Sequence, residues 1–196
     1  IIVVAATIPF FCYNVFSTRK KMFIGDGGTL MIGAILTMAV FQLLSIDSPC
    51  EGLIEDGFGV VAFCLAVMCI PVFDTLRVMT ERICRKVSPF EADKTHLHHL
   101  FIDLGFSHAG TTVTIITLNI LVIVAQWLAW HMGCSVDVQL YIVIGLGVAI
   151  TLGFYLCMTN ISNDNILKRG VKVIGRATHF ERKGAFLILQ KIADRS

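Results

Sequence analysis

The chain has 196 residues, of which 56% are hydrophobic and only 15% are charged, whereas ordinary soluble domains carry about 25% charged residues. Together with a mean hydropathy of +0.78, this composition excludes an ordinary water-soluble domain and predicts a protein that lies in a lipid bilayer. The formal net charge is only +2. No basic stretch is interleaved with aromatic residues, so nucleic acid is not expected as a partner.

Long apolar segments, each close to the length that a membrane-spanning helix needs, recur along the chain. They predict about five spans, near Ile1 to Phe16, Leu30 to Ser45, Gly57 to Met79, Thr112 to Trp130 and Val138 to Met158. In lipid every backbone amide must find a partner within its own segment, so these spans should be helices. We expect an all-α integral membrane protein, with a polytopic helix bundle over residues 1–159 and a short, basic cytoplasmic tail over residues 160–196.

Charge placement indicates how the spans are oriented. All sixteen Lys and Arg residues lie in three clusters, at residues 19–21, 77–94 and 168–195. The alternate loops, near 46–56 and 131–137, contain Asp or Glu but no Lys or Arg. Because loops rich in Lys and Arg stay in the cytoplasm, the three clusters should face inward. Their partners should then be anionic lipid headgroups or phosphorylated substrates.

The first polar motif is "KKMFIGDGGTLMIG", where Asp26 precedes Gly27, Gly28 and Thr29 at the start of an apolar segment. Asp is a favoured helix N-cap, because its carboxylate accepts hydrogen bonds from backbone amides that lack partners. The second interpretation is a ligand of Mg²⁺, since that ion prefers oxygen ligands and glycines let a ligand approach the backbone closely. The motif alone leaves both interpretations open.

The second polar motif is "PVFDTLRVMTERICRK", at the inner end of the third apolar segment. Asp74 and Arg77 lie one helical turn apart, and Arg82 follows. An ion pair at this spacing on an exposed helix contributes only about 0.2–0.5 kcal/mol. However, charge at the edge of the hydrocarbon is costly and tends to serve function. We therefore expect Asp74 to face the interior of the bundle.

The third polar motif is "DKTHLHHLF", which brings together four groups that can contact an anion: Lys94, His96, His98 and His99. Apolar residues at helical spacing predict a short amphipathic helix from near Thr95 to Gly105. On an intact helix His96 and His99 share a face and His98 points elsewhere, so one zinc site using all three is not expected. A helix N-terminus with added cationic donors suits a phosphate or diphosphate. The alternative is a polar helix start that only contacts solvent.

In their order and spacing, these motifs resemble the C-terminal half of the polyprenyl-phosphate N-acetylhexosamine-1-phosphate transferases, over roughly residues 8–110. Residues 25–29, "GDGGT", resemble the family's glycine-Asp-x-Gly-Ser element, with Thr29 in place of Ser. The His-x-His-His pattern of residues 96–99 resembles the branch that uses GlcNAc-1-phosphate. The branch that acts on phospho-muramoyl-pentapeptide has consecutive histidines instead.

The resemblance implies a glycosyl-1-phosphate transferase of the bacterial inner membrane, with its active site and C-terminus in the cytoplasm. Such an enzyme transfers N-acetylhexosamine-1-phosphate from a UDP-sugar to undecaprenyl phosphate, releases UMP, and initiates a cell-envelope glycan such as lipopolysaccharide or O-antigen. The implied cofactor is Mg²⁺, or alternatively Mn²⁺, with Asp26 as a ligand. Asp26, His98 and His99 are the expected catalytic residues. The expected substrate-binding residues are Gly27, Gly28, Thr29, Asp74, Arg77, Arg82, Lys94 and His96.

The chain also departs from the family, since no two adjacent Asp residues occur to match its paired-aspartate motif. We therefore expect further active-site residues in an N-terminal half outside this sequence. The partners considered are the lipid bilayer and a second copy of the chain, in a homodimer. The competing classes are a membrane transporter and a noncatalytic scaffold with an anion-binding inner mouth. Transporters place ionisable groups near mid-membrane, whereas here nearly all lie near one interface.

Overall fold

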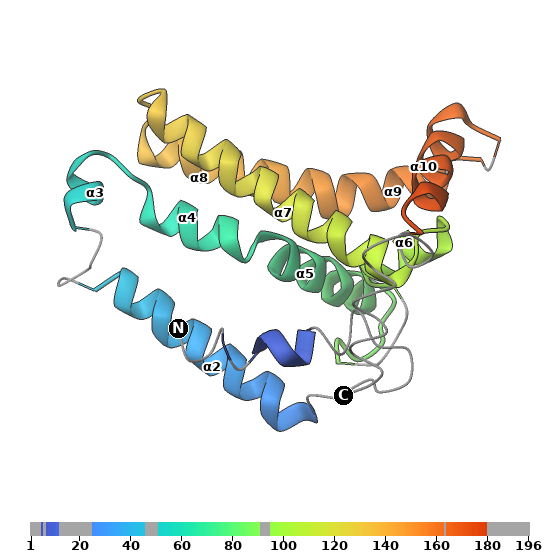
Figure 1. The fold of residues 1–196 in the computed structure, drawn as a ribbon, viewed down its shortest axis with the longest axis horizontal. Coiled ribbons are helices and arrows are strands. Elements are labelled where there is room, and N and C mark those ends of the chain that lie inside the picture. Colours follow the sequence, from blue (N-terminus) through green and yellow to red (C-terminus); the bar gives the residue numbers. More distant parts are fainter. Residues whose placement is uncertain are drawn as a thin grey trace.

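The computed structural model describes residues 5, 7–11, 25–45, 51–90, 95–162 and 164–179, and every regular element in these ranges is helical (Figure 1). This confirms the all-helical prediction for the described residues. Residues 7–11 are helical. The elements that follow are α2 (Gly25–Leu43), α3 (Glu51–Glu55), α4 (Val60–Val67), α5 (Cys69–Cys84), α6 (Leu97–Asp103), α7 (His108–His131), α8 (Val136–Val148), the π-helical η1 (Ala149–Gly153), α9 (Phe154–Asn160) and α10 (Ile166–Ala177).

Two of these helices are long and apolar enough to cross a membrane: α7, and the continuous helix Val136–Asn160 that α8, η1 and α9 form together. The pair α4 and α5 makes a third span if the two count as one. The apolar helix Gly27–Leu43 is shorter. The described helices are consistent with a membrane helix protein. The number of five spans stays a prediction, because most of the first expected segment lies outside the described residues.

Helices α4, α5, α7 and α8 pack through small side chains. Ala62, Ala66, Cys69, Val122 and Val143 are fully buried where these helices meet. In lipid the hydrophobic effect does not drive helices together, so close packing of small residues has to do so.

One glycine makes a still closer approach possible. A Cβ on Gly147 would lie 2.5 Å from the Phe73 ring and 2.8 Å from the Cys69 sulfur. A larger residue at this position would therefore force α8 away from α5.

The end of the bundle opposite α6 is fixed by the buried amide of Gln139. Its Oε1 accepts hydrogen bonds from the Gly59 amide at 2.9 Å and from Gln126 Nε2 at 3.0 Å. Its Nε2 donates to the carbonyl oxygens of Gly57 and Cys134, each at 2.9 Å. One side chain thus ties the start of α4 to both helices of the α7–α8 hairpin.

The predicted span near Gly57 to Met79 is not one straight helix. The chain breaks at Met68, and α4 and α5 meet at a bend of 71°. Pro71 lies in the first turn of α5 and has no amide hydrogen to donate to the carbonyl four residues back, that of Val67. Asn119 of α7 replaces the missing donor: its Nδ2 donates to Val67 O at 2.9 Å, and its Oδ1 accepts from the Ile70 amide at 3.1 Å.

The predicted division at residues 159 and 160 stays a prediction. Helix α9 ends at Asn160, and α10 follows within the segment that we expected to form the cytoplasmic tail.

We predict that Asn119→Ala lowers the free energy of unfolding by about 1–2 kcal/mol, because two backbone groups at the break lose their partner in an apolar setting. The loss should shrink in a Pro71→Ala background, since the alanine introduced there supplies its own amide to Val67 O. Titration with a denaturing detergent in mixed micelles measures both values. Asn160→Ala, the same change at the exposed end of α9, is the control, and equal losses for the two Asn variants would contradict this account.

Candidate functional site

The predicted helix of the histidine motif is present as α6, Leu97–Asp103, with His96 as its N-cap. It ends at Asp103, and Gly105, which follows the C-cap Leu104, has a φ of +92°, a conformation that glycine adopts most readily. The prediction of a helix between about Thr95 and Gly105 is therefore confirmed to within about two residues.

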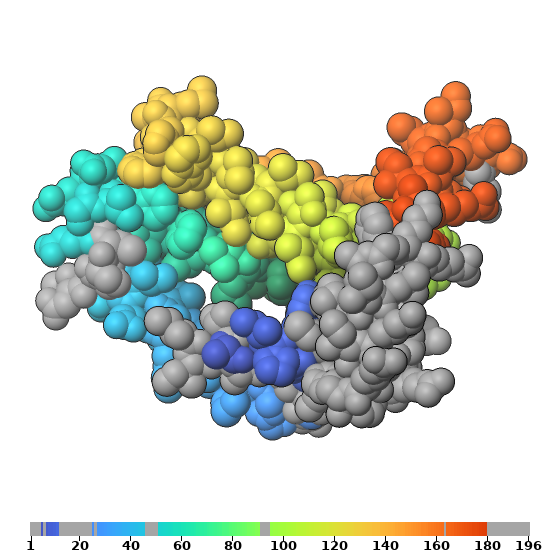
Figure 2. Space-filling view, in the orientation of Figure 1, coloured from blue at the N-terminus to red at the C-terminus, as the bar shows by residue number. Residues whose placement is uncertain are grey.

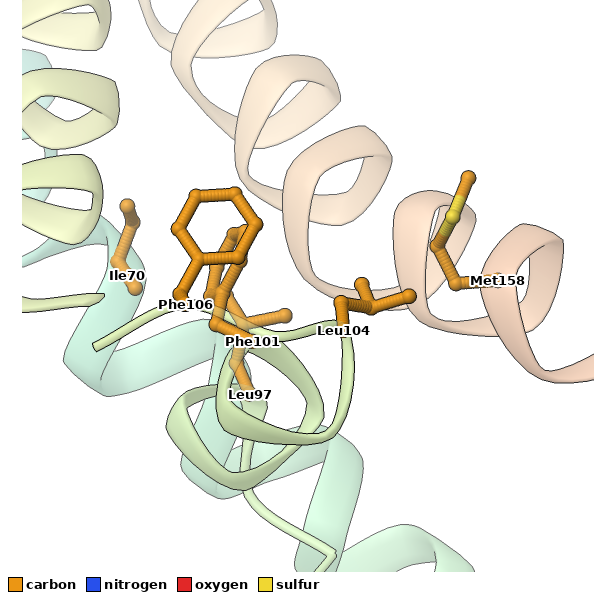
Figure 3. Close-up of a cluster of buried hydrophobic side chains, with 6 residues drawn as sticks. All are labelled: Ile70, Leu97, Phe101, Leu104, Phe106 and Met158. Carbon is orange, nitrogen blue, oxygen red and sulfur yellow. The ribbon is translucent and has the colours of Figure 1, made fainter. Parts of the chain in front are cut away.

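The apolar side of α6 packs into the bundle. Leu97, Phe101, Leu104 and Phe106 form a buried cluster with Ile70 of α5 and Met158 of α9, and Figure 3 shows these side chains gathered between the helices. The Phe101 ring also stacks on Phe154 of α9, with centroids 5.4 Å apart. This packing fixes which side of α6 is left for the histidines.

The buried carboxylate of Asp74 on α5 organises the start of α6. Both of its oxygens lie 3.2 Å from the Leu97 amide, which donates to them. His96 Nδ1 lies 2.9 Å from Oδ2, and since an ionised carboxylate only accepts hydrogen bonds, that ring nitrogen carries the proton. Asp74 thus caps α6 from another helix and orients one of the three histidines.

Arg77 completes this arrangement from one turn further along α5. Its Nη2 donates to Asp74 Oδ1 at 2.8 Å and to the carbonyl oxygen of Thr95 at 2.6 Å, and its Nη1 donates to Glu81 at 3.3 Å. Its guanidinium carbon lies 3.9 Å from the centre of the Tyr155 ring on α9. The expectation that Asp74 faces the interior is confirmed, because only 12% of its side chain and 4% of that of Arg77 are exposed.

The three histidine rings lie together. The rings of His98 and His99 are 4.0 Å apart between centroids, and those of His96 and His98 are stacked at 5.9 Å. The expectation that His98 points away from the others is wrong, because His96 precedes the helix with an extended backbone (φ −58°, ψ 150°) and the helical spacing rule does not apply to it. Among the described residues, no group of three His, Cys, Asp or Glu side chains is arranged to hold a metal ion.

The pKa of His98 is lowered, first by desolvation from its packed neighbours and then by positive charge on His99 and His96, although Asp74 opposes the shift. The neutral ring is therefore favoured near neutral pH. A neutral imidazole can donate one hydrogen bond, and an approaching anion would favour the doubly protonated, charged form.

The glycine motif, residues 25–29, lies at the start of α2, at the same end of the molecule as α6 (Figure 1). Helix α2 begins at Gly25, so Asp26 belongs to its first turn, and the Asp26 side chain lies outside the described residues. Apart from its chain neighbours and the backbone of its own helix, no described atom lies within 4 Å of where a Cβ would stand on Gly27. Gly28 follows it in the helix, and Thr29 Oγ1 donates to the Gly25 carbonyl oxygen at 3.3 Å.

Arg82 and Lys94 are two further residues that we expected to contact substrate. The Arg82 guanidinium is buried and donates to the carbonyl oxygen of Pro89 at 2.6 Å, which closes the loop after α5. Lys94 lies outside the described residues. The sequence analysis did not predict that Arg77 contacts Thr95, Glu81 and Tyr155. Of these contacts, only the one with Glu81 could have been found from the sequence, because an acid four residues after an Arg on a helix often pairs with it.

A cavity of about 370 Å³ opens between α5 and the η1–α9 segment, next to Arg77. Most of its wall is apolar. Its polar groups lie on Arg77, Thr80, Glu81, Thr151 and Tyr155.

We predict that Asp74→Asn lowers the free energy of unfolding by about 3 kcal/mol, as expected when one partner of a buried ion pair loses its charge. Hydrogen exchange at the Leu97 amide should accelerate as well, because its acceptor is weakened. Glu81→Gln is the matched control, since it alters a second carboxylate on Arg77 that does not reach α6. If both variants behaved alike, Asp74 would not be the organising group.

We predict that His98 titrates below the ordinary histidine value of 6.5 in a histidine-selective NMR experiment. Because the fold favours the neutral ring, stability should fall as the pH drops from about 6.5 through the folded-state pKa, and then level off. His99→Gln should raise the pKa of His98 by removing a nearby positive charge. A wild-type pKa at or above 6.5 would contradict the proposed environment.

Comparison with known proteins gives several bacterial relatives. The chain is 33% identical over 100 residues to the decaprenyl-phosphate N-acetylglucosaminephosphotransferase of Mycolicibacterium smegmatis. This match covers 50% of this chain and 25% of the relative. It is 29% identical over 114 residues to the undecaprenyl-phosphate alpha-N-acetylglucosaminyl 1-phosphate transferase of Escherichia coli K12, and 31% identical to that of Salmonella typhi; each match covers 57% of this chain and 29% of the relative.

The matched part of the chain therefore spans only between a quarter and a third of these relatives. No family model matches the chain. No solved structure matches it either. The matches confirm the resemblance found in the motifs: over about half of its length, the chain is similar to relatives named as polyprenyl-phosphate N-acetylglucosamine-1-phosphate transferases.

Proposed function

We propose that this chain is part of a membrane enzyme that transfers N-acetylhexosamine-1-phosphate, with GlcNAc as the preferred sugar, from a UDP-sugar to undecaprenyl phosphate. In this reaction a phosphate oxygen of the lipid attacks the sugar-bearing phosphorus, and the bond to the leaving UMP oxygen breaks. The observation that carries the proposal is the group of three histidine rings at one end of the bundle, where Asp74 caps α6 and orients His96.

The histidines suit the donor diphosphate. Phosphoryl transfer depends mainly on positioning and on neutralising the charge of the transferred and leaving groups. His98 and His99 present ring nitrogens from the first turn of α6, and His96 is already oriented by Asp74. In this proposal His98 and His99 donate to the phosphates, while Asp74 and Arg77 contribute by holding Thr95 and Leu97 in place on either side of His96.

Asp26 is our candidate ligand for Mg²⁺, or alternatively Mn²⁺. A carboxylate beside glycines fits this ion in kind, because Mg²⁺ takes oxygen ligands and keeps several waters and substrate oxygens. The described residues alone offer no complete metal site, so other ligands would come from the substrate or from other parts of the enzyme. When bound, the ion would neutralise charge on the phosphate oxygens.

The lipid substrate needs an apolar surface that leads to the same end of the bundle. The cavity between α5 and the η1–α9 segment offers such a surface beside Arg77. We propose that it accommodates part of the isoprenoid chain. The phosphate of that lipid would stay at the membrane interface, which we assign to the cytoplasmic side of the bacterial inner membrane from the placement of Lys and Arg.

We predict that His98→Ala and His99→Ala each reduce transfer by roughly ten- to a hundredfold, because each removes a hydrogen bond to a charged group worth about 1.5–3 kcal/mol. The assay incubates membranes that contain the full-length protein with radiolabelled UDP-GlcNAc and undecaprenyl phosphate, with Mg²⁺ or with a chelator. Label should enter the lipid fraction only with the metal. The apparent affinity for undecaprenyl phosphate should stay unchanged.

His131→Ala is the matched control, because His131 ends α7 and contacts Trp127 and Trp130, away from the histidine motif. Near-normal transfer by both His98→Ala and His99→Ala would show that these two histidines do not take part in the reaction. Absence of lipid-linked label with the wild-type enzyme, under all conditions, would instead refute the activity.

A further inference from the structure

Helix α10 is strongly amphipathic. Its twelve residues, ILKRGVKVIGRA, include four basic residues and no acidic one. At 100° per residue the basic side chains occupy one arc of the helix, and the apolar side chains occupy the opposite arc. The basic residues are Lys168, Arg169, Lys172 and Arg176.

A narrow edge of α10 docks on the junction between α6 and α7. Gly175 is buried so closely against Phe106 that a Cβ would lie 2.7 Å from its ring. Just beyond the helix, the Thr178 carbonyl oxygen accepts a hydrogen bond from Ser107 Oγ at 3.0 Å, and the Thr178 side chain packs on Gly110. The helix is therefore attached to the same segment that carries the histidines.

The apolar arc is left uncovered by this docking. Ile166, Leu167, Val173 and Ile174 are between 60% and 85% exposed. Figure 2 shows the orange and red surface of α10 standing out from the end of the bundle. Exposed apolar side chains gathered on one helix beside a basic arc are typical of helices that lie in a membrane interface.

The position of α10 along the chain favours the same surface. The apolar helix Val136–Asn160 is a candidate membrane span, and α10 begins at Ile166, capped by Asn165. Since a chain extends at most about 3.5 Å per residue, the start of α10 has to lie within roughly 20 Å of the end of that span. The helix is therefore held close to the boundary between lipid and water.

We propose that α10 binds the surface of an anionic phospholipid bilayer, with its apolar arc in the acyl boundary and its basic residues on the lipid phosphates. Charge complementarity identifies the partner, because four cationic side chains without an acidic neighbour on the helix match a surface of negatively charged headgroups. Through Gly175 and Thr178 the bound helix then holds α6 at a fixed depth below the bilayer.

A pocket of about 240 Å³ between α6, α9 and α10 is where one headgroup fits. Lys168 and Lys172 line it together with Thr159 and Asp103, and Leu100, Leu104 and Met158 form its apolar wall. Lys168 Nζ donates to the Ile161 carbonyl oxygen at 3.1 Å, and an ammonium group has three hydrogens to donate. A lipid phosphate can therefore be bound without breaking that contact.

The test is hydrogen exchange of the full chain in nanodiscs made of phosphatidylcholine alone or with phosphatidylglycerol added. The amides of α10 should exchange at least about tenfold more slowly with the anionic lipid, because each basic residue near such a surface contributes roughly fivefold to binding. Arg169→Gln with Arg176→Gln should abolish most of the difference. Inorganic phosphate added to the neutral discs at matched ionic strength should not slow exchange.

Arg85→Gln with Lys86→Gln is the matched control, because it removes two exposed charges at the end of α5 and should leave α10 unchanged. Exchange in α7 reports whether each variant is folded, and the lipid comparison on the wild-type chain does not depend on any variant. Equal protection of α10 in both lipids would overturn the proposal in favour of a protein surface that covers the helix. Protection that appears only in discs with two copies would overturn it in favour of self-association.

Discussion

The carboxylate of Asp74 accepts hydrogen bonds from Arg77, His96 and the Leu97 amide at once, in a place where little water reaches it. A buried charge is tolerated only when its partners are complete and well placed. The relative positions of α5, the loop after it and α6 are therefore coupled, since moving any of them would leave a buried charge without its partner. The positions of the histidines follow from these contacts of Asp74, because they fix His96 and the start of α6.

A second constraint comes from the bilayer, which cannot satisfy backbone groups at a break in a helix. The chain nevertheless bends by 71° at Met68, just before the turn that leads to Asp74. Asn119 makes the bend possible because its side chain donates to the Val67 carbonyl oxygen and accepts from the Ile70 amide. Packing at small residues such as Gly147 then holds α8 close enough to α5 for Tyr155, further along the same span, to cover Arg77. The polar cluster thus depends on apolar packing some distance away.

The sequence alone was sufficient to predict the helical class, α6 and the interior position of Asp74, because each depends on local spacing and on the cost of charge in lipid. It was not sufficient for the break, since Pro71 can end or merely kink a helix, and the side chain that stabilises this break comes from α7. It also misplaced His98, because His96 lies outside the helix whose spacing was applied. Tyr155 carries no signal in the sequence, as its contact with Arg77 exists only once α9 packs on α5.

The central claim is that Asp74 holds the histidines so that they bind the diphosphate of a nucleotide sugar. It is tested most directly by an experimental structure of the full-length protein with UDP-GlcNAc bound. The account predicts diphosphate oxygens within about 3 Å of ring nitrogens of His98 or His99, with Asp74 still bonded to Arg77 and the Leu97 amide. A nucleotide sugar bound elsewhere, with the histidines facing only solvent, would contradict it.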